Sequence, residues 1–205
     1  MKIGIMGGTF DPIHNGHLMI AKTAYSQYHL DEIWFMPNGN PPHKEKSNIG
    51  SDVEKRVEMV RLAIEGYRDF QIELYEALKK TISYSYETME HFVKLYPEHE
   101  FFFIIGADSL FSIEKWVHPE RLFATCTILA AYRDEIDTRE EMYTQINYLK
   151  KKYNARIELI ISPLVKISSS EIRAYCMEKK DISALIPENV KEYIRKEGLY
   201  ESENQ

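Results

Sequence analysis

Short apolar segments alternate with segments of helical periodicity along this 205-residue chain, and this alternation constrains the fold more than any other feature. The run that starts at Glu100, EFFFIIGADS, is apolar on both faces, which is typical of a central strand in a parallel sheet. Strands that alternate with helices predict an α/β fold, namely a single-domain open parallel sheet with helices on both faces. The other segments that read as strands are Lys2–Met6, Glu32–Met36, Phe70–Leu74, Thr125–Tyr132 and Ile157–Ile161.

The segments between these strands carry apolar residues at helical spacing together with helix-start signals. Asn15 is expected to cap a helix that ends near Tyr28, so that Gly16 and His17 fall in its first turn. Two capping-box patterns open further helices. The further helices are expected after Ser51/Glu54, through Met89–Tyr96, over Arg139–Tyr153, after Ser168/Glu171, and from Pro187 to Gly198. We expect one domain over residues 1–205, with the sheet core over 1–165 and C-terminal helices over 166–200.

Every unusual loop of the chain follows a predicted strand. These loops are GGTFDPIHNGH, PNGNPPHK, GADS and, less directly, KISSSEIR. In open parallel sheets, ligands bind at the carboxyl ends of the strands. The four loops are therefore expected to converge on one edge of the sheet.

The first of these loops has the chemistry of a phosphate-binding turn. Gly7 and Gly8 allow a sharp turn and a close approach of backbone N–H groups to a ligand. His14 and His17 stand at the start of the following helix, whose N-terminus favours anions. Both the G-x-G-x-x-G fingerprint and the Walker A loop are missing. The sequence thus predicts a phosphate site of another kind.

Charge and composition exclude several other classes of protein. The net charge is −6 and the pI about 5.7, which argues against nucleic acid as a partner. Cys126 and Cys176 lie far apart and match no metal-binding spacing, so we expect two reduced thiols. The chain shows neither a leader peptide nor an apolar stretch long enough to span a bilayer. We expect a cytoplasmic protein that does not bind membranes.

The motifs also resemble those of a known family. GGTFDPIHNGH resembles the H-x-G-H signature of the nucleotidyltransferase superfamily, which has a Rossmann-like fold. With MPNGNPPHK, IIGADS, ISSSEIR and IPENVKEYIRKEGLY, the chain is similar to the bacterial nicotinate-nucleotide adenylyltransferases from Lys2 to about Tyr200. This resemblance implies the transfer of an adenylyl group from ATP to nicotinate mononucleotide, which gives nicotinate adenine dinucleotide and pyrophosphate in NAD biosynthesis. It implies Mg²⁺ carried by the ATP phosphates, and no metal ligands from the protein.

The resemblance also implies roles for particular residues. The catalytic residues implied are His14, His17, Lys44 and Arg173. The residues implied to bind ATP and its phosphates are Gly8, Thr9, Phe10, His43, Gly106, Asp108 and Ser169. Ser85 and Trp116 are implied to bind the mononucleotide, with Trp116 as the candidate to stack on the pyridine ring.

Alternatives remain open at this stage. Val117 and Ser85 stand where relatives often carry Tyr and Thr, which leaves open the preference for the acid over nicotinamide mononucleotide. Phosphopantetheine is a further candidate acceptor, and a non-catalytic nucleotide sensor is the alternative from another class. The sequence does not set the oligomeric state, and a homodimer is among the options.

Overall fold

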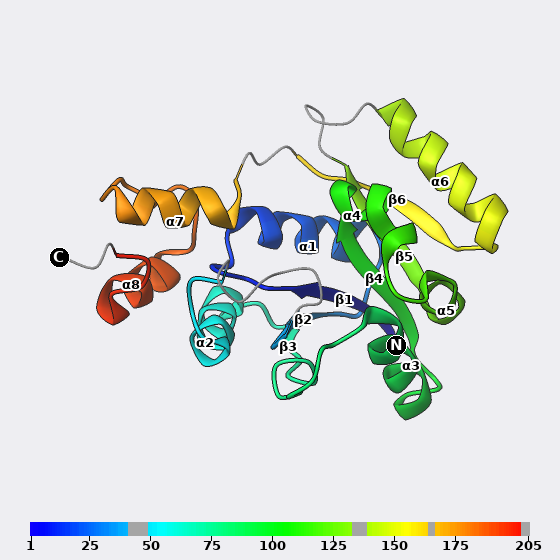
Figure 1. Cartoon of the computed structure of the whole chain (residues 1–205), viewed down its shortest axis with the longest axis horizontal. Helices are drawn as coiled ribbons and strands as arrows, with labels where there is room; N and C mark the ends of the chain where they lie inside the picture. Colours follow the sequence, from blue (N-terminus) through cyan, green and yellow to red (C-terminus); the bar gives the residue numbers. More distant parts are fainter. Residues whose placement is uncertain (41–48, 133–138, 164–166, 202–205) are drawn as a thin grey trace.

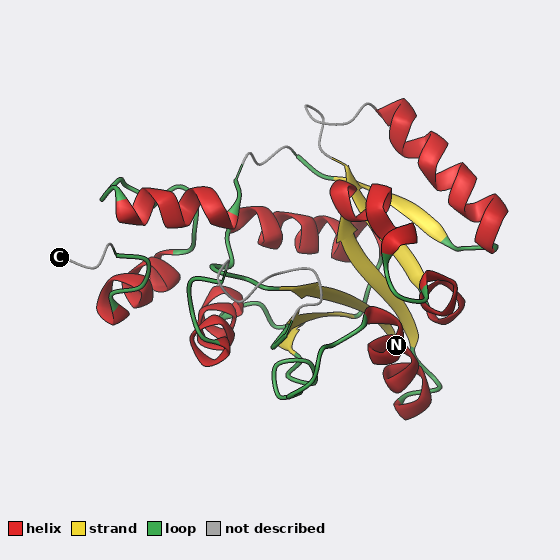
Figure 2. Ribbon diagram, viewed as in Figure 1, coloured by secondary structure: helices red, strands yellow, loops and turns green. Residues whose placement is uncertain are grey.

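A six-stranded parallel sheet forms the centre of the computed structural model, which describes residues 1–40, 49–132, 139–163 and 167–201 (Figures 1 and 2). The strands lie in the order β3-β2-β1-β4-β5-β6. In the register, Ile5 of β1 is paired with Trp34 on one side and Phe103 on the other. This confirms the predicted open parallel α/β sheet. The strands are β1 (Lys2–Gly8), β2 (Glu32–Pro37), β3 (Phe70–Ile72), β4 (Glu100–Gly106), β5 (Thr127–Tyr132) and β6 (Ile157–Ile161).

Helices cover both faces of the sheet. The described helices are α1 (Asn15–Tyr28), α2 (Val53–Ile64), α3 (Ser85–Leu95), α4 (Ala107–Ser112), the 3₁₀ helix η2 (Ile113–Lys115), α5 (Pro119–Thr125), α6 (Arg139–Tyr153), α7 (Ser169–Met177) and α8 (Glu188–Glu197). Successive strand residues point to opposite faces, and the two apolar cores divide accordingly. Helices α1, α2, α7 and α8 pack on one face, and α3 to α6 pack on the other.

Two adjacent residues of β4 show how the cores separate. Phe102 belongs to the core on the side of α1 and α2, whereas Phe103 belongs to the core on the side of α3 to α6. Both side chains are buried, as the apolar run of this strand predicts.

The connection between β4 and β5 is more helical than the sequence suggested. It holds α4, η2 and α5, and β5 starts at Thr127 rather than at Thr125. Thr125 ends α5, and its hydroxyl donates a hydrogen bond to the carbonyl of Leu122 at 2.7 Å. These elements are only three to seven residues long, which is too short to produce a clear periodic pattern.

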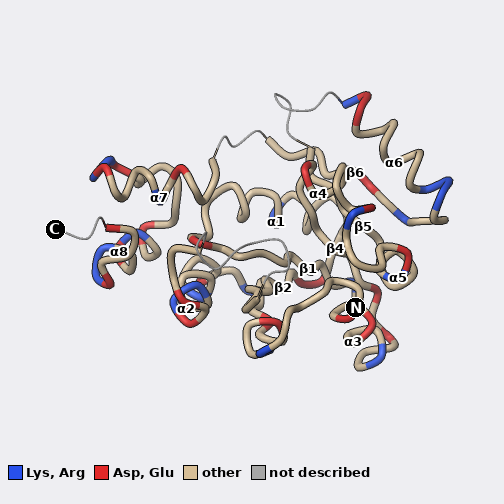
Figure 3. Tube along the Cα trace, viewed as in Figure 1, with Lys and Arg blue, Asp and Glu red and all other residues tan. Residues whose placement is uncertain are grey.

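Strand order changes direction between β1 and β4, because β2 and β3 extend the sheet on one side and β5 and β6 on the other. Such a switch point is the usual position of a ligand site in an open parallel sheet. No described helix is both long and apolar enough to cross a membrane. In Figure 3, basic and acidic residues are intermingled along the outer helices.

Candidate active site

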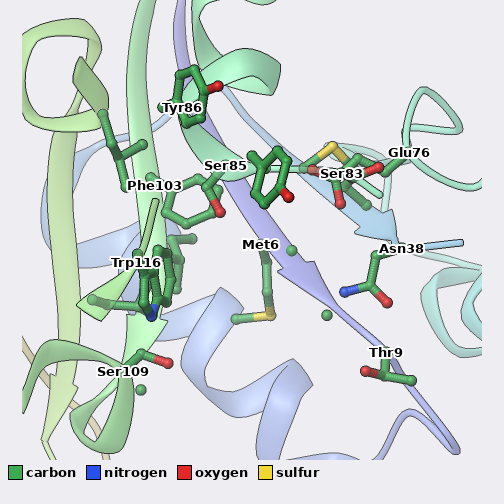
Figure 4. A pocket seen from close by; sticks show the side chains of 18 of the residues that line it. Met6, Thr9, Asn38, Glu76, Ser83, Ser85, Tyr86, Phe103, Ser109 and Trp116 are labelled. Atoms are coloured by element: carbon green, nitrogen blue, oxygen red, sulfur yellow. The ribbon is translucent and has the colours of Figure 1, made fainter. Parts of the chain in front are cut away.

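A cavity of about 360 Å³ opens at the switch point, above the carboxyl ends of β1 and β4. The loop after β1 forms one side of it, and the start of α3 and the segment after η2 form another (Figure 4). Its lining residues include Met6, Gly7, Gly8, Thr9, His17, Asn38, Glu76, Ser83–Tyr86, Phe103–Gly106, Ser109, Trp116 and Val117. The loops that the sequence singled out after β1 and β4 therefore meet, as expected.

The two histidines of the first loop lie against each other. Their ring centroids are 3.8 Å apart. The backbone N–H of His14 donates to Nδ1 of His17 at 3.3 Å. Because Nδ1 accepts, a neutral His17 carries its proton on Nε2, which makes that nitrogen a hydrogen-bond donor. His17 lines the cavity at the switch point, and a smaller neighbouring cavity is lined by both histidines.

The cap of α1 is His14 and not Asn15, so the sequence prediction was wrong at this position. Asn15 is the first helical residue, where its N–H and Nδ2 donate to the carbonyls of Leu185 and Ala184 at 2.9 and 3.1 Å. The N–H of His17 bonds to the His14 carbonyl at 3.0 Å. The first turn of α1 therefore has fewer amides available for an anion than a free N-terminus would have.

Three side chains of α2 and α7 donate hydrogen bonds to backbone carbonyls of the loop after β1. Arg56 Nη1 donates to the Thr9 carbonyl at 2.7 Å. Arg173 Nη1 donates to the Asp11 carbonyl at 2.7 Å, and Ser169 Oγ donates to the Pro12 carbonyl at 2.9 Å. Arg173 and Ser169, which were expected to address phosphates, thus contact the loop itself.

Phe10 fills the space beneath this loop. Its side chain is buried, its φ is 51°, and its ring edge meets the His17 ring with centroids 5.1 Å apart. A Cβ on Gly8 would lie 3.0 Å from the Phe10 ring, so a larger residue at this position would require the ring to shift by a few tenths of an ångström. Phe10 therefore supports His17 by packing.

The end of β4 opens directly into the cavity. Gly106 lines it, and a Cβ placed on Gly106 would meet no atom within 4 Å. Asp108 is exposed in the first turn of α4 and is not among the lining residues, whereas its neighbour Ser109 is. The sequence analysis did not single out Ser109.

The residues expected at the mononucleotide end come together in the cavity wall. Ser85 is the first residue of α3, and Trp116 follows η2. Trp116 is half-buried and meets Phe103 edge to face, with ring centroids 6.5 Å apart. Val117 beside it is 43% exposed. The cavity thus has one aromatic wall and, close by, the N-terminus of an 11-residue helix.

Besides Ser109, the sequence analysis did not single out the polar lining residues Asn38, Glu76 and Ser83 (Figure 4). Among the described residues, Asn38 Oδ1 and the buried Ser83 Oγ have no hydrogen-bond partner. The Glu76 carboxylate accepts from Thr88 Oγ1 at 2.7 Å, and burial raises its pKa above the ordinary value. Asn38 lies in the PNGNPPHK loop that the sequence did single out, whereas nothing in the local sequence distinguishes Glu76 and Ser83 from ordinary loop residues.

Two predicted site residues, His43 and Lys44, lie outside the described residues. Within the described part of the chain, no group of three or more His, Cys, Asp or Glu side chains could hold a metal ion. The donors around the first loop are imidazoles, hydroxyls and amides, which suit phosphate oxygens better than a bare cation. A divalent cation fits this site when phosphate oxygens provide its ligands.

Comparison with known proteins gives consistent results over nearly the whole chain. The model of the cytidylyltransferase-like family matches residues 5–175. A protein of Clostridium kluyveri is 43% identical over 202 residues, which cover 98% of this chain and 99% of that protein. One from Bacillus cereus is 43% identical over 201 residues, with the same coverage. Both bear the name "Probable nicotinate-nucleotide adenylyltransferase".

Solved structures with a similar fold include the nicotinic acid mononucleotide adenylyltransferase of Plasmodium falciparum. Its complex with NaAD aligns with a TM-score of 0.78 at 23% identity, over 97% of both chains. Its complex with APC aligns with a TM-score of 0.77, also at 23% identity, over 97% of this chain and 96% of that one. At this identity the likeness concerns the fold.

Proposed function

This chain belongs to the cytidylyltransferase-like family, and we propose that it transfers the adenylyl group of ATP to nicotinate mononucleotide. The products are nicotinate adenine dinucleotide and pyrophosphate, in a late step of NAD biosynthesis. The relatives named for this activity are similar over their full length. The observation that carries the proposal is one cavity that joins the two-histidine loop to Trp116 and the start of α3.

The reaction is a displacement at phosphorus. A phosphate oxygen of the mononucleotide forms a bond to the α-phosphorus of ATP, and the bond from that phosphorus to the bridging oxygen of pyrophosphate breaks. The attacking phosphate is already largely ionised near neutral pH, so no strong general base is required. The protein must align the two phosphates and offset the charge that develops on the leaving group.

The first loop supplies hydrogen-bond donors for this task. His17 donates from Nε2, because its Nδ1 accepts from the N–H of His14. Such a donor acts on charge that grows in the transition state. His14 and the amides of Gly8, Thr9 and Phe10 are proposed to contact the ATP phosphates from the same side.

Positive charge comes from other segments. We assign Lys44 and His43 to the incoming phosphates because a lysine ammonium is a compact point charge that binds phosphate oxygens. Arg173 is fixed to the Asp11 carbonyl by Nη1, and we assign its remaining nitrogens to the triphosphate. Gly106 and Asp108 are assigned to the adenosine, and Ser169 to the triphosphate end.

Mg²⁺ is proposed to accompany ATP. When bound to the phosphates, it neutralises charge on the oxygens of the leaving pyrophosphate. The protein residues then hold the metal–nucleotide complex through its phosphates, since the donors of the first loop are N–H and O–H groups.

The acid form of the mononucleotide suits the other end of the cavity. Ser85 and Tyr86 begin α3 and line the wall. Amides in the first turn of a helix favour an anion, so a nicotinate carboxylate is preferred there to an uncharged amide. Trp116 is assigned to stack on the pyridine ring. The substrates are thus two small molecules, and the two free cysteines fit a reducing compartment such as the cytoplasm.

A pyrophosphate-release assay tests the proposal. ATP is paired in parallel with nicotinate mononucleotide, nicotinamide mononucleotide and phosphopantetheine, and the products are identified by mass. We expect nicotinate mononucleotide to give the highest kcat/KM. Preference for the amide would overturn the acceptor assignment, and a lack of turnover with all three would overturn the transferase assignment in favour of nucleotide sensing.

A further inference from the structure

The buried carboxylate of Asp11 joins parts of the chain that lie far apart in sequence. It is 1% exposed and accepts from the N–H of Gly50 at 2.7 Å, Ser51 Oγ at 2.6 Å and the hydroxyl of Tyr200 at 2.7 Å. Arg173 Nη1 lies 3.6 Å from the same carboxylate. A buried charge is stable only when it is paired and hydrogen-bonded, and here both conditions are met.

Tyr200 packs and forms hydrogen bonds within the cluster formed by Asp11, Gly50, Ser51 and Arg173. Its hydroxyl also lies 3.2 Å from Ser51 Oγ, and a Cβ on Gly50 would stand 3.0 Å from its ring. Its φ is 61°, a left-handed conformation that a bulky residue seldom adopts unless its surroundings hold it there. Burial and the Asp11 carboxylate raise the pKa of Tyr200, so the hydroxyl remains a donor. The C-terminal Gly-Leu-Tyr segment thus ends in a fixed position beside the first loop.

The cluster is continuous with the backbone of the phosphate-binding loop. Arg173 Nη1 donates a hydrogen bond to the carbonyl of Asp11 and forms an ion pair with its carboxylate. Arg56 donates to the carbonyl of Thr9 from Nη1 and to the carbonyl of Ser51 from Nε, the latter at 3.3 Å. A trans peptide is planar, so a Thr9 carbonyl held toward Arg56 directs the amide of Phe10 to the opposite side. A shift in the cluster is therefore transmitted to loop amides and to the ring beneath His17.

We propose that Tyr200 is a positioning residue for adenylyl transfer, which acts through Asp11 to hold the phosphate-binding loop in its working geometry. This inference rests on the proposed function and extends it to a segment that does not line the cavity. Reacting groups must be placed closely, and small displacements are costly in rate. Loss of the Tyr200 hydroxyl should therefore impair the use of ATP more than the use of the mononucleotide.

The test compares two tyrosines that each donate to an aspartate. Tyr200→Phe removes the 2.7 Å bond to Asp11, and Tyr25→Phe removes the 2.8 Å bond to Asp69. Asp69 directly precedes β3, so it lies at the amino ends of the parallel strands. The cavity lies at the opposite, carboxyl ends. Both variants keep the ring, and both are expected to lower the melting temperature by a few degrees. Kinetic constants are measured well below that temperature.

For Tyr200→Phe we expect kcat/KM for ATP to fall about tenfold, with KM for the mononucleotide within about twofold of the unmodified chain. Tyr25→Phe should leave both constants unchanged. Ser51→Ala, which removes another donor to Asp11, should reproduce the effect of Tyr200→Phe. The double variant should lose less than the product of the two single losses, because both act through one carboxylate.

Two outcomes would overturn the proposal. One is a Tyr200→Phe enzyme whose kinetic constants match those of Tyr25→Phe, which would make the hydroxyl a purely structural donor. The other is a KM for the mononucleotide that rises as much as the KM for ATP. Titration of the same variants with a non-hydrolysable ATP analogue separates this inference from the proposed function. If the unmodified chain binds the analogue but transfers nothing, the function fails, whereas weaker binding in Tyr200→Phe alone still supports the positioning role.

Discussion

The backbone N–H of His14 donates to Nδ1 of His17 at 3.3 Å, so the first turn of α1 determines which nitrogen of a neutral His17 carries the proton. The histidine that lines the cavity is thereby presented as an Nε2 donor before any ligand binds. A donor that is fixed in advance costs no reorganisation during the reaction. This relationship explains the position of His17, three residues after the residue whose backbone N–H it accepts from.

Replacement of His17 by Ala is expected to lower kcat by about 10²-fold or more, because one donor to the developing charge is lost. KM for either substrate should change far less. Steady-state kinetics with both substrates checks this. His29→Asn, at the opposite end of α1, is the control, since Asn also tolerates the φ of 50° at that position. A near-normal kcat for His17→Ala would remove His17 from the mechanism.

Trp116→Ala is expected to raise KM for the mononucleotide roughly tenfold, because stacking of an aromatic side chain on a base is worth about 1–3 kcal/mol. KM for ATP should hardly change. The other tryptophan provides the control: Trp34→Phe alters a side chain that packs against Phe92 and Phe101, away from the cavity. Equal increases of both KM values in Trp116→Ala would contradict stacking on the pyridine ring.

Gly106→Ala separates folding from nucleotide binding. The added Cβ meets no protein atom within 4 Å, and the φ of −80° suits alanine, so the melting temperature should stay within about 2 °C of the unmodified chain. The methyl group enters the space assigned to adenosine, and KM for ATP should rise at least several-fold. Thermal unfolding and kinetics of the same preparation give both values. An unchanged KM for ATP would show that adenosine does not approach this strand end.

Glu76 gives the stability of the fold a pH dependence with a defined sign. Burial raises its pKa in the folded chain and outweighs the opposing effects of Thr88 and Lys79. The protonated Glu76 carboxyl therefore contributes fully to the free energy of unfolding when the pH is below its unfolded pKa of about 4.5. This contribution is lost as the pH rises through its higher pKa in the folded chain. Glu76→Gln, which keeps an acceptor for Thr88, should be more stable than the unmodified chain at neutral pH, because the buried site then holds no charge.

Denaturant unfolding of both proteins between pH 4 and pH 8 checks this prediction. The stability difference should be smallest at the acid end and grow with pH until the Glu76 carboxyl is fully ionised. A difference that stays constant over the range would show that the pKa of Glu76 is not raised in the folded chain.

Much of the architecture could be predicted from the sequence because the sheet is buried on both faces. The predicted strand that starts at Glu100 and the predicted helix over Arg139–Tyr153 are both confirmed at these positions. The short helices α4 and α5 could not be predicted, since tertiary contacts rather than periodicity define elements of this length. The prediction that Asn15 caps α1 was wrong for a related reason. Asn is the better capping residue in isolation, but here its donors bond to Ala184 and Leu185.

The site was predictable where the chemistry lies in a compact motif and not where it depends on burial. The loop that contains His14 and His17 stands out in the sequence, and it does line cavities at the sheet edge. Arg56 does not stand out, because an arginine in a helix is normally solvated, yet it is 1% exposed and bonded to the loop. Glu76 and Ser83 are recognised only from their positions in the folded chain.

The most direct test of this account is a crystal structure of the chain with a non-hydrolysable ATP analogue. We predict that the triphosphate lies over the loop after β1, with phosphate oxygens within hydrogen-bond distance of the His14 and His17 rings. The structure contains another cavity, which borders α7 and α8 and is lined by Lys179, Lys180 and Lys191. A triphosphate bound there, or anywhere remote from both imidazoles, would contradict the account.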